Sequence, residues 1–221
     1  MNTKDHRTIS IAEQIFEQLE KDILSGKYQR GEVISEGKLS QELGVSRTPV
    51  REAVMRLLQD HVLMETSKGL TVVGITKQDI RDMYEIRTEI EGRAGAMAAA
   101  NITDEELEEL GRVLDLQRYY VEKGDPREYA DNIKDLDTQF HALLYRASRS
   151  MAYIDVLIPM HMKMTKFRKA SVSKKSRAVE SISEHQEIYD ALKKHDTELT
   201  RVKVLKHTAN ARDRSLALPE V

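Results

Sequence analysis

Four side chains in the second half of the chain are spaced so that they could bind one metal ion. Asp137 and His141 are four residues apart, so they share one face of a helix. His185 lies ten residues before a predicted helical turn at 195–196, and His207 lies about twelve residues after it. At a rise of about 1.5 Å per residue, both imidazoles would lie at nearly the same height on antiparallel neighbours. One carboxylate and three imidazoles suit Zn²⁺, Ni²⁺, Mn²⁺ or Fe²⁺ more than Ca²⁺. Spacing alone leaves open that these are ordinary histidines of a charged protein.

A second chemistry, DNA recognition, is indicated by residues 43–58. Gly44 supplies a sharp turn, Ser46 is placed to cap the next helix, and Pro49 lies where a missing N–H costs nothing. One helical face is apolar and comprises Val50, Val54, Leu57 and Leu58. The exposed N-terminal end of this helix contains Arg47, Thr48 and Arg51. This end of a recognition helix is the part that reaches base edges. The alternative is any capped amphipathic helix after a tight turn.

The elements around this helix predict a winged helix-turn-helix. Helices are expected at 11–25 and 36–43, and short strands at 62–65 and 70–73. Lys68 and Gly69 lie in the intervening turn and would approach the minor groove or its phosphates, where Gly allows close approach and Lys adds charge.

The rest of the chain predicts an antiparallel bundle of six helices, so the fold is mostly α. The helices are expected at about 76–101, 103–123, 127–147, 151–168, 178–194 and 196–216, with a polar loop at 169–175. The first ends in the small residues 94–100, which permit close helix approach in the core or across a dimer. We expect a flexible tail at 1–10, a DNA-binding domain at 11–75 and an all-helical metal-binding, effector-binding and dimerisation domain at 76–217.

Composition excludes several classes of protein. Charged residues make up 33% of the 221 residues and no 18-residue apolar run exists, so no membrane span is expected. The chain has no cysteine and its first ten residues lack a signal-peptide core, which is compatible with a cytoplasmic location. Residues 1–76 carry 10 Lys and Arg against 11 Asp and Glu, a net charge of −1. A neutral DNA-binding module needs a second half-site, so we expect a homodimer on a near-palindromic operator.

The stretch Val-Ser-Arg-Thr-Pro-Val-Arg-Glu-Ala at 45–53 resembles the signature of the GntR superfamily of bacterial transcription regulators, as do 32–36 and 39–44. The resemblance implies operator contacts by Arg47 and Arg51, helped by Thr48 and the wing glycine Gly69. The family often has arginine where this chain has Gly37, and the neighbouring Lys38 is a substitute.

The motif Asp137-x-x-Phe-His141 and the later stretch 185–192 resemble the FadR-like branch of that superfamily, whose all-helical effector domain is called FCD. The resemblance implies that Asp137, His141, His185 and His207 are metal ligands, that the six-helix bundle is of the VanR-like form, and that acyl-CoA is not the effector. In related regulators a small organic acid lies beside the metal.

A basic side chain could hold the far end of such an acid. The candidates are Arg87, Arg146 and Arg168, each of which could instead be structural or exposed; Tyr145 could line the cavity or simply pack. His161 and His195 are expected at the surface.

The sequence therefore predicts a ligand-responsive transcription regulator and not an enzyme. One alternative is a metalloregulator in which the ion itself is the signal. A more distant alternative is a metal-dependent enzyme fused to a DNA-binding domain, for which no general base is placed.

Overall fold

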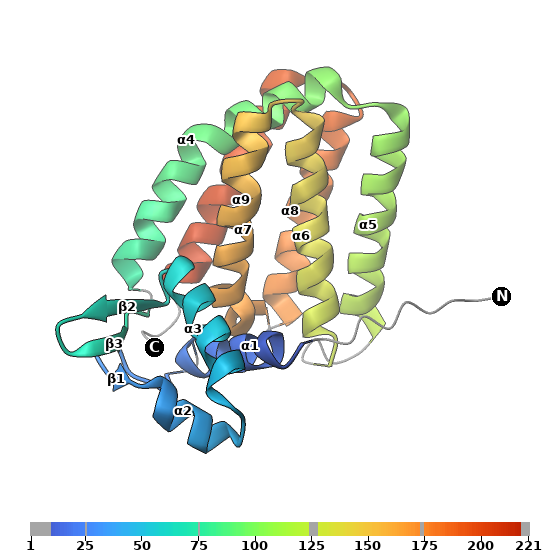
Figure 1. Cartoon of the computed structure of the whole chain (residues 1–221). Coiled ribbons are helices and arrows are strands. Elements are labelled where there is room, and N and C mark those ends of the chain that lie inside the picture. Colours follow the sequence, from blue (N-terminus) through green and yellow to red (C-terminus); the bar gives the residue numbers. More distant parts are fainter. Residues whose placement is uncertain (1–9, 25, 75, 124–127, 173–174, 218–221) are drawn as a thin grey trace. The chain divides into compact units, whose positions relative to one another are not determined.

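The computed structural model describes residues 10–24, 26–74, 76–123, 128–172 and 175–217, and leaves the side chains of Leu24, 166–172 and 175–176 undescribed. The chain divides into two compact units, one ending at Thr76 and the other beginning at Lys77 (Figure 1). Apart from Ser10, the predicted N-terminal tail lies outside the described residues.

The first unit has the predicted three helices and wing, with one strand that the sequence did not reveal. Its elements are α1 (Ile11–Leu24), β1 (Val33–Ile34), α2 (Glu36–Leu43), α3 (Arg47–Gln59), β2 (Leu63–Thr66) and β3 (Gly69–Val72). The antiparallel sheet has the order β1-β3-β2, with Val33 opposite Thr71 and Leu63 opposite Val72. A strand of two residues is too short to show the alternation of polar and apolar residues that predicts a strand. Its partner β3 is also far along the chain, so β1 was not predicted.

The turn between α2 and α3 differs from its prediction in one respect. Gly44 adopts the left-handed conformation at φ +67°, as a sharp turn requires. Ser46 stands at the N-cap of α3, but its side chain accepts no capping hydrogen bond, so that prediction is wrong. The side chain that does cap a helix here is Ser35, which accepts the N–H of Lys38 at 3.2 Å.

The second unit consists of six helices within the described ranges. They are α4 (Lys77–Asn101), α5 (Asp104–Lys123), α6 (Ala130–Ala147), α7 (Met151–Val172), α8 (Lys175–Leu192) and α9 (Thr197–Leu216). The loop predicted at 169–175 is wrong for most of its length, because α7 continues to Val172 and α8 already begins at Lys175.

The small residues of α4 lie in the core, where they allow α9 to approach. Gly92, Gly95 and Ala98 are buried, and a Cβ added to Gly95 would meet Val204 at 2.8 Å. Ile86 was expected to face inward with the other apolar residues of this helix, but its side chain is 48% exposed. The adjacent Arg87 is the buried residue at that turn, where Glu91 neutralises its charge.

Candidate metal centre

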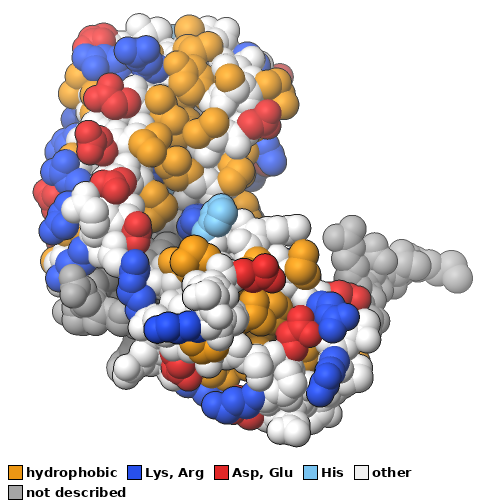
Figure 2. Space-filling model, turned by 60° about the vertical axis from the view of Figure 1, so that its left-hand side comes forward, with side chains coloured by type: hydrophobic (Ala, Val, Ile, Leu, Met, Phe, Trp, Pro, Cys, Tyr) orange, Lys and Arg blue, Asp and Glu red, His pale blue; other side chains and the backbone are white. Residues whose placement is uncertain are grey.

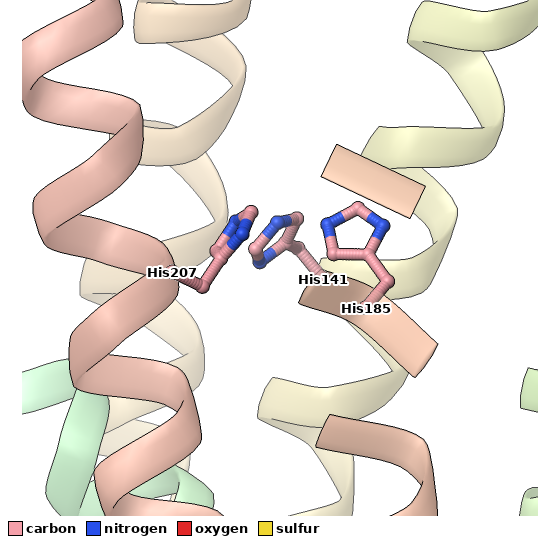
Figure 3. A group of neighbouring side chains, drawn as sticks. All are labelled: His141, His185 and His207. Atoms are coloured by element: carbon pink, nitrogen blue, oxygen red, sulfur yellow. The ribbon is translucent and has the colours of Figure 1, made fainter. Parts of the chain in front are cut away.

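Three buried imidazoles meet inside the helical unit. His141 comes from α6, His185 from α8 and His207 from α9, and their rings face one another between the helices (Figure 3). One ligand atom from each lies within 4.8 Å of the other two. The rings of His185 and His207 have centroids 4.7 Å apart, as their similar distances from the α8–α9 turn predict.

Asp137 lies at the edge of this cluster, one helical turn before His141. Its Oδ1 is 3.7 Å from Nε2 of His185, and its Oδ2 is 3.1 Å from Nε2 of His161. The carboxylate is therefore within reach of the position between the imidazoles, and the structure brings all four predicted metal ligands together.

His161 on α7 is the functional candidate that sequence reasoning missed. The expectation that it lies at the surface is wrong: it is 2% exposed, and its ring centroid is 4.1 Å from that of His141. Helical spacing could have predicted the burial of His161, because it shares one helical face with Leu157, Met164 and Thr165, which are also buried. Among nonpolar neighbours at that spacing, a histidine points into the core.

A carboxylate and an amide contact two of the three imidazoles on their outer nitrogen. Nδ1 of His207 lies 2.7 Å from Glu184, which also accepts two 2.7 Å bonds from Arg214. Nδ1 of His185 lies 3.2 Å from Oε1 of Gln117. An imidazole that donates its Nδ1–H keeps the lone pair of Nε2 for a metal ion, the usual arrangement around protein metal sites.

The Glu184 carboxylate remains ionised despite its partial burial. Burial would raise the pKa of Glu184, but the hydrogen bonds from Arg214 and His207 hold it well below its usual range. A negative carboxylate at this point increases the basicity of the His207 ring.

The inner nitrogens show that the residues fit a metal ion. Nε2 of His141 and Nε2 of His207 are buried and have no hydrogen-bond partner among the described residues. A buried, unsatisfied polar atom costs about 1–3 kcal/mol, which an ion at the centre would relieve. Burial, with a further contribution from His161, keeps the pKa of His141 well below its usual value, so this ring is held in the neutral form that binds metals.

A second grouping, Glu91 with His141 and His161, suits an ion less well. Their ligand atoms also lie within 4.8 Å of one another. However, one oxygen of Glu91 accepts a bond from Arg87 and the other accepts one from Thr208. The carboxylate is thus already used, and the three-histidine group is the better candidate.

A pocket that is partly open to solvent adjoins the cluster. Asp137 and His185 belong to its lining, which also contains the basic residues Lys134, Arg177 and Arg214. The sequence spacing could have identified two of these as neighbours of the predicted metal ligands. Lys134 precedes Asp137 by one helical turn, and Arg214 follows His207 by two turns.

The structure does not support the predicted effector-binding role of three residues. Arg87 and Tyr145 are absent from the cavity lining, and both are buried against Glu91. A guanidinium that is already paired in the core is not available to a ligand. Arg146 is exposed on α6 and does not line the cavity, because it lies on the outer face of that helix. The side chain of Arg168 lies outside the described part of the chain.

The predicted DNA-contacting residues are exposed on the first unit. Ser46, Arg47, Thr48 and Arg51 lie at the start of α3, Lys38 lies on α2, and Lys68 and Gly69 form the tip between β2 and β3. Gly69 has φ +117°, a conformation that other residues rarely adopt, so the wing tip requires glycine.

Carboxylates restrain some of the basic side chains in this unit. Nε of Arg51 lies 3.2 Å from Glu36, and Nζ of Lys38 lies 3.7 Å from Glu42. Arg56 pairs with Glu13 at 2.5 Å, and its guanidinium lies over the ring of Phe16. Its position in this internal contact makes Arg56 a structural residue.

Comparisons with known proteins agree with this arrangement. Residues 11–73 match the family described as bacterial regulatory proteins, gntR family, and residues 82–210 match the FCD domain. The chain is 30% identical to the uncharacterized HTH-type transcriptional regulator YdhC of Bacillus subtilis, over 88% of this chain and 86% of that protein. It is 27% identical to the HTH-type transcriptional repressor RspR of Escherichia coli, over 94% and 90%.

Among solved structures, E. coli McbR/YncC is similar, with a TM-score of 0.66 and 25% identity over 92% of this chain and 95% of that one. A regulator of the Listeria monocytogenes agr system has the same fold, with a TM-score of 0.74 and 19% identity over 95% and 98%. Within the described residues, no helix combines the length and apolar character that crossing a membrane requires.

Proposed function

Because the chain belongs to the gntR family of bacterial regulatory proteins and carries an FCD domain, we propose that its binding to operator DNA is controlled by a small carboxylate held beside a divalent metal ion. Its relatives are transcriptional regulators and not enzymes, so the metal would serve recognition of a ligand and not turnover.

One observation carries the proposal: Nε2 of His141 and Nε2 of His207 are buried without a hydrogen-bond partner among the described residues, next to a cavity lined by basic residues. Asp137, His141, His185 and His207 would hold the ion. Zn²⁺, Ni²⁺, Mn²⁺ and Fe²⁺ all accept this donor set. A divalent ion attracts a carboxylate, and the cations of Lys134 and Arg177 are placed at the same cavity to bind another part of an acidic ligand.

The regulatory step requires a difference in affinity. A ligand shifts DNA binding only if it binds the DNA-bound and the free protein with different affinity. We therefore propose that filling the cavity changes the preferred arrangement of the DNA-binding units in a dimer.

A homodimer on a near-palindromic operator in the cytoplasm completes the proposal. Hydrophobic side chains gather on one face of the helical unit (Figure 2). The neighbouring helices α4 and α7 carry five large exposed ones: Ile86, Met97, Met151, Val156 and Met162. An apolar face of this kind on a soluble regulator is typical of a subunit interface, and a second copy of the chain would cover it.

The test is elemental analysis combined with an operator titration. Protein is purified without chelator or a nickel column, alongside His185→Ala and the control His195→Asn. His195 lies at the α8–α9 turn with φ +50°, which asparagine tolerates. We expect about one metal per chain in the wild type and the control, and loss of the metal in His185→Ala.

Small carboxylates are then titrated against the operator complex. Release or tightening that requires the metal supports the proposal. An operator affinity that follows the concentration of free metal, and that no acid changes, would instead identify a metalloregulator. Absence of metal from every form would overturn the metal-based part while leaving the family assignment intact.

A further inference from the structure

The hydroxyl of Tyr145 connects the candidate metal centre to a buried ion pair. Tyr145 follows His141 by one turn of α6 and is 1% exposed. Its oxygen lies 3.2 Å from Nδ1 of His141 and also contacts Oε1 of Glu91 on α4. His141 is therefore held by a tyrosine that is itself held by a carboxylate, whereas Glu184 and Gln117 contact the other two imidazoles directly.

The direction of these hydrogen bonds follows from the number of protons available. Glu91 accepts a 2.7 Å bond from Arg87 and a 2.6 Å bond from Thr208. Burial alone would raise the pKa of Glu91, but the Arg87 guanidinium holds it below its usual range. An ionised carboxylate can only accept, so the single proton of the tyrosine hydroxyl points to Glu91.

The tyrosine oxygen then faces His141 with its lone pairs. Nδ1 of His141 must supply the proton of that contact, because no other hydrogen lies between the two atoms. In a neutral imidazole this places the lone pair on Nε2, the buried nitrogen without a partner among the described residues.

We propose that Tyr145, oriented by Glu91, is a positioning residue that fixes His141 in the Nδ1-protonated form and directs its Nε2 at the metal ion. The inference rests on the proposed metal binding. It also ties the metal centre to α4 through Glu91 and to α9 through Thr208. Without the hydroxyl, Nδ1 of His141 would lose its acceptor, and the two tautomers would compete.

The test uses Tyr145→Phe, which removes one oxygen and keeps the ring. Replacing Glu91 is less useful, since it would leave Arg87 buried without its partner and could unfold the protein. The matched control is Tyr84→Phe. Tyr84 is also fully buried in the helical unit, but its hydroxyl lies 2.9 Å from Ser215 and not from a histidine.

Two quantities are measured on the full chain. The imidazole ¹⁵N chemical shifts of His141 in metal-free protein report its tautomer, and competition with a chelator reports the affinity for Zn²⁺. We expect Tyr145→Phe to weaken Zn²⁺ binding about 10- to 100-fold, the usual effect of losing an outer-sphere partner, and to move His141 away from a single Nδ1–H form. Tyr84→Phe should change neither.

Each outcome decides the inference. If Tyr145→Phe keeps both the wild-type tautomer and the wild-type affinity, or if Tyr84→Phe weakens Zn²⁺ as much, the positioning role is overturned. If the wild-type protein binds no Zn²⁺, the proposed metal dependence fails, and the ¹⁵N shifts alone then decide whether Tyr145 sets the tautomer of His141.

Discussion

At the scale of single residues, the partner of each arginine decides its role. Arg87 is buried against Glu91, and Arg56 is held by Glu13 over an aromatic ring. Arg47 is exposed at the start of α3, and one of its terminal nitrogens lies 3.6 Å from the place where a Cβ on Gly37 would stand. That separation is ordinary van der Waals contact, so the guanidinium lies beside the backbone at position 37. Only exposed arginines of this kind are available to DNA.

We expect Arg47→Ala and Arg51→Ala to weaken operator binding by about 1–3 kcal/mol each if the side chains contact base edges. Fluorescence anisotropy at several salt concentrations, with operator and scrambled DNA, measures the effect. A base contact is shown by lost discrimination, and a phosphate contact by uniform weakening with a smaller salt dependence. The control Arg112→Ala removes an exposed arginine of α5 and should bind normally. Wild-type affinity in both test variants would refute the assignment of α3 as the recognition helix.

At the scale of the elements, the glycines of α4 determine how closely α9 can pack. Gly92 and Gly95 face Leu205 and Val204, and an added Cβ would meet these side chains at 2.9 and 2.8 Å. The sequence left open whether the small residues serve the core or a dimer. Their burial places Ala94, Gly95, Ala98 and Ala99 in the core of one chain, on a helix that packs against α9.

We expect Gly95→Ala to destabilise the helical unit by about 1–3 kcal/mol, because the new methyl group overpacks against Val204. This loss must exceed the gain of about 1 kcal/mol that alanine brings inside a helix. Urea denaturation measures it, with Ala100→Ser at an exposed position of α4 as the control. Adding Val204→Ala should recover part of the loss. A Gly95→Ala protein more stable than the wild type would show that α4 and α9 are not closely packed.

At the scale of the whole molecule, charge and apolar surface both point to a second copy. Residues 1–76 have a net charge of −1, so general attraction to phosphates is weak, which supports the proposed binding of two half-sites by a dimer. The exposed apolar side chains of α4 and α7 provide a face that two copies could share.

We expect the double variant Ile86→Asp, Met97→Asp to be monomeric by light scattering after size exclusion. Its operator affinity should fall by about 10²- to 10⁴-fold, because the second half-site no longer binds as part of one molecule. Leu116→Asp, at a similarly exposed position on α5, is the control and should remain dimeric. A double variant that stays dimeric would place the interface on another face.

The sequence by itself determined the features that local spacing encodes. Arg47 and Arg51 at the start of an amphipathic helix follow from helical periodicity, and the wing glycine Gly69 follows from the spacing of two short strands. Helical spacing and distances to a turn made Asp137, His141, His185 and His207 candidates, and the family resemblance implied that they are metal ligands.

Only the tertiary structure decided which residues surround those ligands. Gln117 contacts His185 across 68 positions of sequence, and Thr208 contacts Glu91 across 117. The burial of His161 likewise depends on how α7 packs against α6. Periodicity predicts which face of a helix is buried. The rotation and the height of one helix relative to another are set by the packing of the whole core, and hydrogen bonds between helices depend on that rotation and height.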